Sequence, residues 1–328
     1  MGPAFPTLIE SIMTALVTRL LSFLFALVVA SLLLFVAIKV VPGTAAGAAL
    51  GIDATPQAIA RFNATHGLDR PVYVQYLEWA SNTLHGDFGT SFQNGVDVGP
   101  ELGRRFLVTL ELAGLAFIVA NLIAIPLGTW AALRHQRASD SIITTLATLF
   151  GAVPSFFLAT LLILLLTLRL KLLPPGGYIP FSQDPVANLR LMVMPALSLG
   201  IVSSALLVRI MRAAMIEVMS SDFIRTARAK GAPQRIVVLR HAIRNALSTY
   251  LNVAAVEFGF LFGSVVVIED IFRIPGLGSF VLTGILNRDY PVLLASALSI
   301  TVFVLVVNLI VDVAVQLLDP RVTDKKAA

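Results

Sequence analysis

The chain contains no cysteine and little charge. None of its 328 residues is Cys, which excludes disulfides and thiolate metal sites and leaves the redox compartment open. Only 13% of the residues are Asp, Glu, Lys or Arg, whereas about a quarter are charged in a typical soluble domain. Hydrophobic residues make up 57%, and the mean hydropathy is +0.87. This composition excludes a soluble globular domain and predicts a polytopic membrane protein.

Motifs for enzyme chemistry are also missing. The sequence has no G-x-x-x-x-G-K-[ST] phosphate loop, so it does not hydrolyse nucleotides by that route. Its four histidines lie outside the long apolar runs, which disfavours a metal-dependent intramembrane hydrolase. We therefore expect no catalytic, cofactor-binding or metal-binding residue in this chain, and we predict that it is not an enzyme.

Six apolar runs account for the composition. Each suits a helix of roughly 20 residues that crosses a hydrocarbon core of about 30 Å. Barrel strands alternate polar and apolar residues, whereas these runs are continuous. We predict an all-α fold with six transmembrane helices over Leu20–Ile38, Leu112–Leu133, Ser141–Leu168, Leu191–Val208, Asn245–Ile268 and Tyr290–Val311. We interpret the first as an uncleaved helix, because it is longer than the apolar region of a signal peptide.

The basic residues predict the topology. The formal charge is +5, and most of the 24 Lys and Arg residues lie near the termini, in residues 134–140 or in residues 209–245. Because positively charged loops stay in the cytoplasm, both termini are expected on that side of the membrane. We divide the chain into a first helix with a structured external loop, residues 1–106, and a five-helix core, residues 107–328.

The external segments have predicted structure of their own. Thr55 as N-cap and Pro56 at the first position indicate a short helix over residues 55–62. A second helix is expected over residues 72–84, followed by a glycine-bounded turn at residues 85–91. Before the last run, apolar residues from Phe280 to Leu286 indicate a short helix that leans on the bundle.

The passage from Asp222 to Asn245 is basic and lies between two apolar runs. Ser221 and Asp222 are expected to cap a helix over residues 223–230, which Gly231 ends at positive φ and Pro233 follows with a new start. On charge alone, a topology signal or lipid contact is as good an explanation as a docking site. The order of cap, glycine and proline favours a rigid projection that contacts another protein.

Polar residues inside the apolar runs are candidates for a substrate pathway. Ionisable groups at membrane depth are Glu111, Glu257 and Asp312, of which Glu257 is the most central. For Glu257, lining a polar pathway and bonding a neighbouring helix stay equally open. Pro154 breaks the third run, and such a break either kinks a helix or lines a passage. The predicted pathway residues are Asn121, Pro154, Ser155, Phe156 and Glu257.

Several motifs occur together in a specific order. They are Gly67-Leu68-Asp69-Arg70-Pro71, Gly86-Asp87-Phe88-Gly89-Thr90-Ser91, Thr109-Leu110-Glu111-Leu112, Pro154-Ser155-Phe156, Arg225-Thr226-Ala227-Arg228-Ala229-Lys230-Gly231, Leu239-Arg240-His241-Ala242-Ile243-Arg244-Asn245-Ala246, Ile274-Pro275-Gly276-Leu277-Gly278, Arg288-Asp289-Tyr290-Pro291 and Asp319-Pro320-Arg321. Together they resemble the inner-membrane permease subunits of bacterial ABC importers for dipeptides, oligopeptides and nickel. The long first external loop is similar to that of the first of the two paralogous permeases.

The resemblance implies a type I importer permease fold and a peptide-class substrate moved by alternating access. It also implies partners: a homologous second permease, two cytoplasmic ATPases that bind ATP and Mg²⁺, and an external solute-binding protein. The passage at residues 220–247 looks like the EAA loop that inserts into the ATPase, with coupling residues Phe223, Arg225, Thr226, Ala227, Arg228, Lys230 and Gly231. Residues expected to face the binding protein are Gly86, Asp87, Phe88, Gly89, Asp270, Arg273, Pro275, Gly276, Arg288 and Asp289.

The sequence departs from this family at three positions. Arg225 stands where the general importer motif begins with Glu, Thr249 replaces a proline, and Thr44 replaces an aspartate. Two other classes stay open from the residues themselves. A secondary transporter would use the same helices and acids without an ATPase, and a membrane-bound enzyme would require a nucleophile or metal cluster that the sequence does not show.

Overall fold

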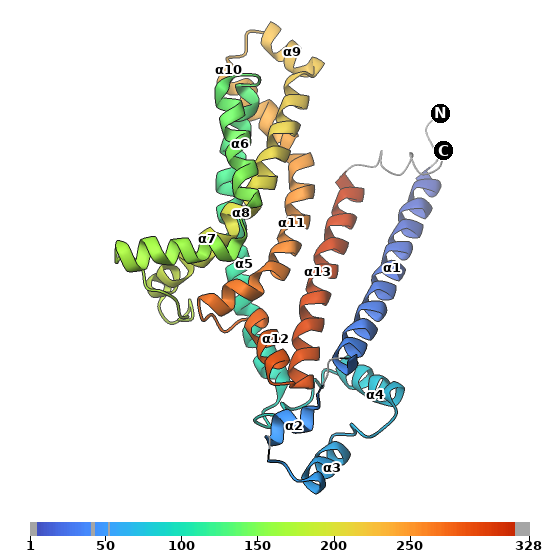
Figure 1. The fold of residues 1–328 in the computed structure, drawn as a ribbon. Coiled ribbons are helices and arrows are strands. Elements are labelled where there is room, and N and C mark those ends of the chain that lie inside the picture. Colours follow the sequence, from blue (N-terminus) through green and yellow to red (C-terminus); the bar gives the residue numbers. More distant parts are fainter. Residues whose placement is uncertain (1–4, 41–42, 52, 319–328) are drawn as a thin grey trace. The chain divides into compact units, whose positions relative to one another are not determined.

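The computed structural model describes residues 5–40, 43–51 and 53–318, and the regular secondary structure of this part of the chain is helical apart from one isolated bridge between Thr90 and Asp97 (Figure 1). Two compact units form, residues 1–109 with 275–328 and residues 110–274. The long helix α5, Val98–Leu133, begins in the first unit and continues into the second. The predicted division at residue 106 keeps the last helix with the core, and that division stays a prediction.

The first unit is built around a pair of long helices. Its elements are α1 (Phe5–Val40), α2 (Ala45–Leu50), α3 (Pro56–Thr65), α4 (Val72–Leu84), α12 (Leu277–Leu286) and α13 (Tyr290–Leu318). Helix α13 packs against both α1 and α12. The ring centroid of Phe35 on α1 lies 5.5 Å from that of Tyr76 and 5.8 Å from that of Trp79. These ring contacts hold α4 against α1.

The predicted short helices of this unit are confirmed. Helix α4 covers the expected residues, and α3 begins at Pro56 with the Thr55 side chain accepting a hydrogen bond from the backbone N of Ala58. Helix α12 is the expected apolar helix before the last span, although it starts three residues earlier than Phe280. Local signals, the Thr55 cap and the apolar composition, were sufficient to predict where these helices lie in the sequence.

The second unit surrounds α8, Pro185–Met219. The other elements are α6 (Ala138–Ala152), α7 (Ser155–Leu162), the π-helical turn η1 (Ile163–Arg169), α9 (Asp222–Ala229), α10 (Gln234–Ile236), the π-helical turn η2 (Val237–Ala242) and α11 (Ile243–Ile271). Helix α8 packs against α6, α7 and α11. A Cβ at Gly200 would lie 2.7 Å from the Ala116 carbonyl oxygen, so α8 approaches α5 at a distance that only glycine permits.

The structure corrects the third predicted transmembrane helix. Instead of one helix over residues 141–168, α6 ends at Ala152 and the chain bends by 96° into the segment Ser155–Arg169. Pro154 supplies no backbone N–H and restricts Val153 to an extended conformation, so a break was expected, but not a right-angled one. Among the residues that the structure describes, five helices are long and apolar enough to span a membrane, and the count reaches six if this bent pair is one span.

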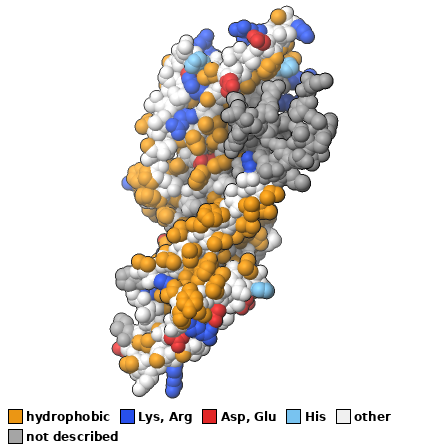
Figure 2. Space-filling view, turned by 90° about the vertical axis from the view of Figure 1, so that its right-hand side faces the viewer, with side chains coloured by type: hydrophobic (Ala, Val, Ile, Leu, Met, Phe, Trp, Pro, Cys, Tyr) orange, Lys and Arg blue, Asp and Glu red, His pale blue; other side chains and the backbone are white. Residues whose placement is uncertain are grey.

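The surface fits a membrane setting. The exposed side chains along the long helices are largely hydrophobic (Figure 2), and those of α1 include Leu21, Phe25 and Leu33. A soluble protein rarely exposes contiguous apolar patches of this extent. The chain therefore spans the membrane several times.

Candidate functional site

The connection between α8 and α11 forms a short helix with two different faces. On one side of α9, Ile224 is fully buried and Ala227 is partly buried, and both pack on a core cluster that includes Met215, Val237, Val238 and Ala242. The predicted contact residues Phe223, Arg225, Thr226, Arg228 and Lys230 are all exposed on the rest of the helix. The resemblance predicts an outward contact for Ala227 as well. The core packing shows instead that Ile224 and Ala227 anchor the helix.

Gly231 ends this helix as predicted. Its φ is +80°, and the backbone N–H groups of Gly231 and Ala232 donate to the carbonyls of Arg228 and Ala227 at 2.9 and 3.2 Å. A Cβ built at Gly231 would meet no atom within 4 Å, so space does not require the glycine. The backbone conformation does, because L-residues seldom adopt positive φ.

The predicted cap at the start of α9 is wrong in its bonding. Ser221 occupies the N-cap position with extended backbone, but its Oγ donates back to the Val218 carbonyl at 2.5 Å and makes no capping bond. Asp222 lies in the first turn, where its negative carboxylate interacts favourably with the positive end of the helix dipole. The helix covers residues 222–229, one residue earlier at each end than predicted.

A buried ion pair joins α6 to the helix that leads into α9. Asp140 is 4% exposed and accepts from Arg212 Nε and Nη2 at 2.6 and 2.7 Å. The backbone N of Gln136 and the Nδ1 of His135 lie 3.1 and 3.2 Å from the same carboxylate. No sequence motif predicted this cluster. The available signal was Asp140 itself, a single acid in a basic connection.

The predicted pathway residues have different surroundings. Asn121 of α5 accepts from the hydroxyl of buried Tyr250 on α11 at 2.6 Å and donates to the Phe117 carbonyl at 2.7 Å. Asn121 therefore forms a hydrogen bond between α5 and α11 within the second unit. Phe117 and Phe258 extend the same contact, with ring centroids 5.2 Å apart.

Glu257 is a partly buried acid of the second unit. It lies on α11 one turn after buried Ala254 and two turns after Tyr250, so helical spacing places it on their side of the helix. The side chain is partly buried, and no hydrogen bond or ion pair to it occurs among the described residues. Helix α7, which starts at Ser155 after the Pro154 break, packs against the same helix α11. Pro154 and Phe156 are exposed, and Ser155 is partly buried.

Glu111 of α5 has a hydrogen-bond partner for only one of its two carboxylate oxygens. Glu111 Oε2 accepts from the Tyr178 hydroxyl at 2.9 Å, while its Oε1 is buried with no partner. Burial, and then the hydrogen bond to Glu111, raise the pKa of Tyr178 to about 12. The phenol is therefore a stable hydrogen-bond donor across the physiological pH range.

The residues expected to face a binding protein divide between exposed and buried positions. In the first unit, Gly86, Asp87 and Pro275 are exposed, and Phe88, Gly89 and Arg288 are partly buried. Asp270 and Arg273, in the second unit, are also exposed. Asp289 is only 3% exposed and accepts from Ser91 Oγ and the Phe92 backbone N, at 2.5 and 3.0 Å. Gly276 is buried too. Asp289 thus fixes the start of α13 to the loop at residues 91–92 and has no free surface for a partner.

Comparison with known proteins decides what this arrangement belongs to. Residues 124–324 match the family described as the binding-protein-dependent transport system inner membrane component, and residues 12–113 match the N-terminal component of such systems. The chain belongs to this family. Its members are the permeases of binding-protein-dependent ABC importers, so the chain is a transport subunit that spans the membrane several times.

Relatives match the permease along nearly its whole length. A putative peptide transport system permease protein of Brucella abortus (strain 2308) is 37% identical over 311 residues, 94% of this chain and 99% of the relative. A probable peptide ABC transporter permease protein of Sinorhizobium fredii is 33% identical, covering 93% and 97%. A glutathione transport system permease protein of Salmonella typhi is 34% identical, covering 94% and 98%.

One solved structure also matches the permease in part. It is the crystal structure of an amino acid ABC transporter with histidines, and the match covers 68% of this chain and 94% of that chain at 18% identity and a TM-score of 0.45. Family membership confirms the resemblance inferred from the sequence motifs and does not favour the secondary transporter.

Proposed function

We propose that the permease moves peptides, or small solutes related to them, across the inner membrane by alternating access driven by ATP. Relatives named as peptide and glutathione permeases support this substrate class, since glutathione is itself a short peptide. The proposed assembly contains this chain, a homologous second permease, two ATPases that bind ATP and Mg²⁺, and an external solute-binding protein.

The two faces of α9 carry the coupling role. Because Ile224 and Ala227 are packed in the core of the second unit, a force on α9 is transmitted to η2 and to the end of α8 rather than lost in a loose loop. On the exposed face, Phe223 is 46% exposed and stands beside Arg225 and Arg228. An apolar side chain flanked by cations suits a groove with an apolar floor and carboxylate or carbonyl groups at its rim.

The proposed topology places α9 and both termini in the cytoplasm. Lys and Arg side chains gather at the end of the second unit where Figure 1 shows α9, as the space-filling view of Figure 2 illustrates. Arg225, Arg228, Lys230 and Arg235 are all exposed there. Basic segments of this kind stay on the cytoplasmic side, where ATP and the ATPases are also found.

Glu257 is the proposed contact for the peptide amino group. It is a carboxylate at membrane depth that has no internal partner among the described residues, and a peptide carries an ammonium group of the opposite charge. Asn121 bonds Tyr250 and is proposed to hold α5 against α11 beside this position. Pro154, Ser155 and Phe156 provide the bend from which α7 reaches α11.

The coupling proposal is tested by comparing the same substitution at two exposed phenylalanines, one on α9 and one outside it. Phe223→Ser in the assembled importer is expected to lower ATP-driven peptide uptake by at least about tenfold, since truncation of a central apolar anchor costs an interface more than a tenfold change in affinity. Phe181→Ser is the matched control, because Phe181 is 52% exposed and lies outside α9. Normal uptake with Phe223→Ser, or uptake by the permease in vesicles without any ATPase, would contradict the proposal.

The Glu257 contact is tested separately by uptake kinetics. Glu257→Gln is expected to raise the peptide concentration needed for half-maximal uptake while ATPase copurification stays normal, because only the substrate contact is removed. Glu217→Gln, at an exposed glutamate of α8, is the control. Unchanged kinetics in Glu257→Gln would remove this residue from the pathway without affecting the coupling role of α9.

A further inference from the structure

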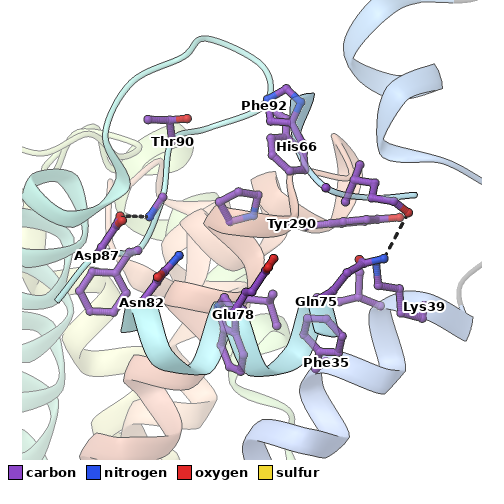
Figure 3. Close-up of a pocket in the computed structure, with 18 residues that line it drawn as sticks. Phe35, Lys39, His66, Gln75, Glu78, Asn82, Asp87, Thr90, Phe92 and Tyr290 are labelled. Atoms are coloured by element: carbon purple, nitrogen blue, oxygen red, sulfur yellow. Dashed lines mark hydrogen bonds between the residues drawn. The ribbon is translucent and has the colours of Figure 1, made fainter. Parts of the chain in front are cut away.

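The first unit contains a cavity of about 290 Å³ whose walls all belong to that unit (Figure 3). One side is α4, with Gln75, Glu78 and Asn82 at helical spacing along its inner face. The other walls come from the end of α1, the turns at residues 66–68 and 87–92, and the start of α13. The transport mechanism proposed above does not use this cavity.

Lys39, at one end of the cavity, is a cation without an anion. Its Nζ donates to Gln75 Oε1 at 2.5 Å and lies 5.5 Å and 5.3 Å from the ring centroids of Phe35 and Tyr290. No carboxylate among the described residues pairs with it, and Glu78, which lines the same cavity, is bonded to Arg70. The amide and the aromatic faces stabilise the ammonium group but leave its charge uncompensated, and a partly buried charge of this kind favours an anionic ligand.

The opposite end of the cavity has the opposite character. Figure 3 shows Asp87 and Lys39 at opposite ends, with Asn82 beside Asp87. One oxygen of Asp87 accepts from the Gly89 backbone N at 2.8 Å, which leaves the other oxygen available. The Asn82 side chain has no hydrogen-bond partner among the described residues. A carboxylate oxygen and an amide oxygen are suitable acceptors for an ammonium group.

Aromatic rings line the cavity between its two charged ends. On one wall, the ring centroids of His66 and Phe92 are 4.6 Å apart. Trp79 and Tyr290 supply further apolar surface. A volume of about 290 Å³ is small for a ligand pocket and suits a ligand of the size of a dipeptide. Ligand sites in proteins commonly combine apolar walls with a few polar groups in this way.

We propose that this cavity binds a small zwitterion, a dipeptide, with its carboxylate at Lys39 and its ammonium group at Asp87. The choice of ligand rests on the proposed function, since it takes the cargo to be peptidic. The cavity then acts as a second recognition site in the permease itself, independent of the solute-binding protein.

Trp79 provides a direct measurement of binding. The chain has two tryptophans, Trp79 in the cavity wall and Trp130 in the second unit, so the Trp130→Phe permease reports Trp79 emission alone. Purified full-length permease in lipid nanodiscs is titrated with Ala-Leu, which carries no chromophore. A saturable change in emission is expected. N-acetyl-Ala-Leu and Ala-Leu-amide are each expected to bind at least about tenfold more weakly, because each loses one charge-assisted hydrogen bond.

Two variants assign the ends of the cavity. Lys39→Gln is expected to remove the preference for Ala-Leu over its amide and to keep the preference over the N-acetyl form, and Asp87→Asn is expected to do the reverse. Lys171→Gln, at an exposed lysine in the second unit, is the control and should keep both preferences. The comparison of blocked and free peptides on the unmodified cavity remains decisive if a variant does not fold.

Equal binding of free and blocked peptides, or no saturable change, would overturn the proposal. A response only when the solute-binding protein is added would also overturn it, because the carboxylate at Lys39 would then come from a partner side chain. ATP-driven uptake is measured on the same preparation assembled with its partners. Peptide uptake without a Trp79 response rejects only the cavity, and a Trp79 response without peptide uptake rejects the proposed transport function.

Discussion

Arg212 binds both carboxylate oxygens of Asp140, at 2.6 and 2.7 Å, and so ties the first turn of α6 to α8. Asp140 is 4% exposed, and its remaining neighbours, the Gln136 N–H and His135, are held at the same carboxylate. Helix α8 ends at Met219 and leads within three residues into α9. The pair therefore stiffens the helices on which the proposed coupling helix is mounted.

Removing one partner of this pair should destabilise the permease strongly. Asp140→Asn leaves the Arg212 guanidinium without its counter-ion in a largely buried position, so we expect a loss of about 3 kcal/mol in the free energy of unfolding. Thermal unfolding in detergent measures it. Asp222→Asn is the control, because the Asp222–Arg225 pair is almost fully exposed and should contribute less than about 1 kcal/mol. Equal effects of the two substitutions would show that burial of Asp140 has no energetic importance.

A side chain at Gly231 should affect coupling through backbone conformation alone. Gly231→Val is expected to cost about 1–2 kcal/mol at this φ of +80° and to displace α9, lowering substrate-stimulated ATP turnover in the assembled importer. Gly263→Ala is the control. A Cβ there also meets no atom within 4 Å, but Gly263 lies inside α11 and has no positive φ. Wild-type turnover in Gly231→Val would show that α9 does not need this ending.

The bond between Asn121 and Tyr250 should contribute to helix association. Tyr250→Phe removes the hydroxyl that donates to Asn121 Oδ1 at 2.6 Å, and we expect a loss of about 1 kcal/mol. A double-mutant cycle with Asn121→Ala isolates the pair, and unfolding in detergent supplies the four free energies. Additive effects would mean that each side chain acts through its own packing and that the hydrogen bond adds nothing.

The Tyr178 phenol should lose its proton at a higher pH than an ordinary tyrosine. Its pKa is raised to about 12 because the phenol is partly buried and donates to Glu111, whereas an ordinary tyrosine titrates near pH 10. Since the folded-state pKa is above the unfolded one, the stabilisation is fully present below about pH 10 and is lost as the pH rises toward 12. The ultraviolet difference spectrum between wild type and Tyr178→Phe measures this titration. Glu111→Gln should lower the midpoint, and a midpoint near 10 in the wild type would contradict the assigned hydrogen bond.

Local features of the fold were predictable from the sequence because their causes are local. The Thr55 cap, the span of α4 and the positive φ of Gly231 depend on the residues within one or two helical turns. The bend after α6 was predictable in position from Pro154 but not in size. Its angle of 96° depends on how α7 packs against α8 and α11, which no local pattern contains.

Candidate site residues were predicted unevenly for the same reason. Exposure of Arg225, Arg228 and Lys230 follows from their charge. The inward position of Ile224 and Ala227 does not, because an apolar residue on a short amphipathic helix fits a partner's groove as well as its own core. Asp289 was expected to face the binding protein because of the family resemblance, and only its bonds to Ser91 and Phe92 show that it is internal.

The sequence by itself determined that this chain is an importer permease with long membrane helices and a basic segment that includes α9, because composition, apolar runs and ordered motifs are properties of the chain alone. Tertiary structure decided which polar groups are satisfied. Asp140 and Asn121 found partners on other helices, whereas Glu257 has no partner and Lys39 has no counter-ion among the described residues. Pairing between residues far apart in sequence depends on how helices pack, and one-dimensional spacing does not contain that information.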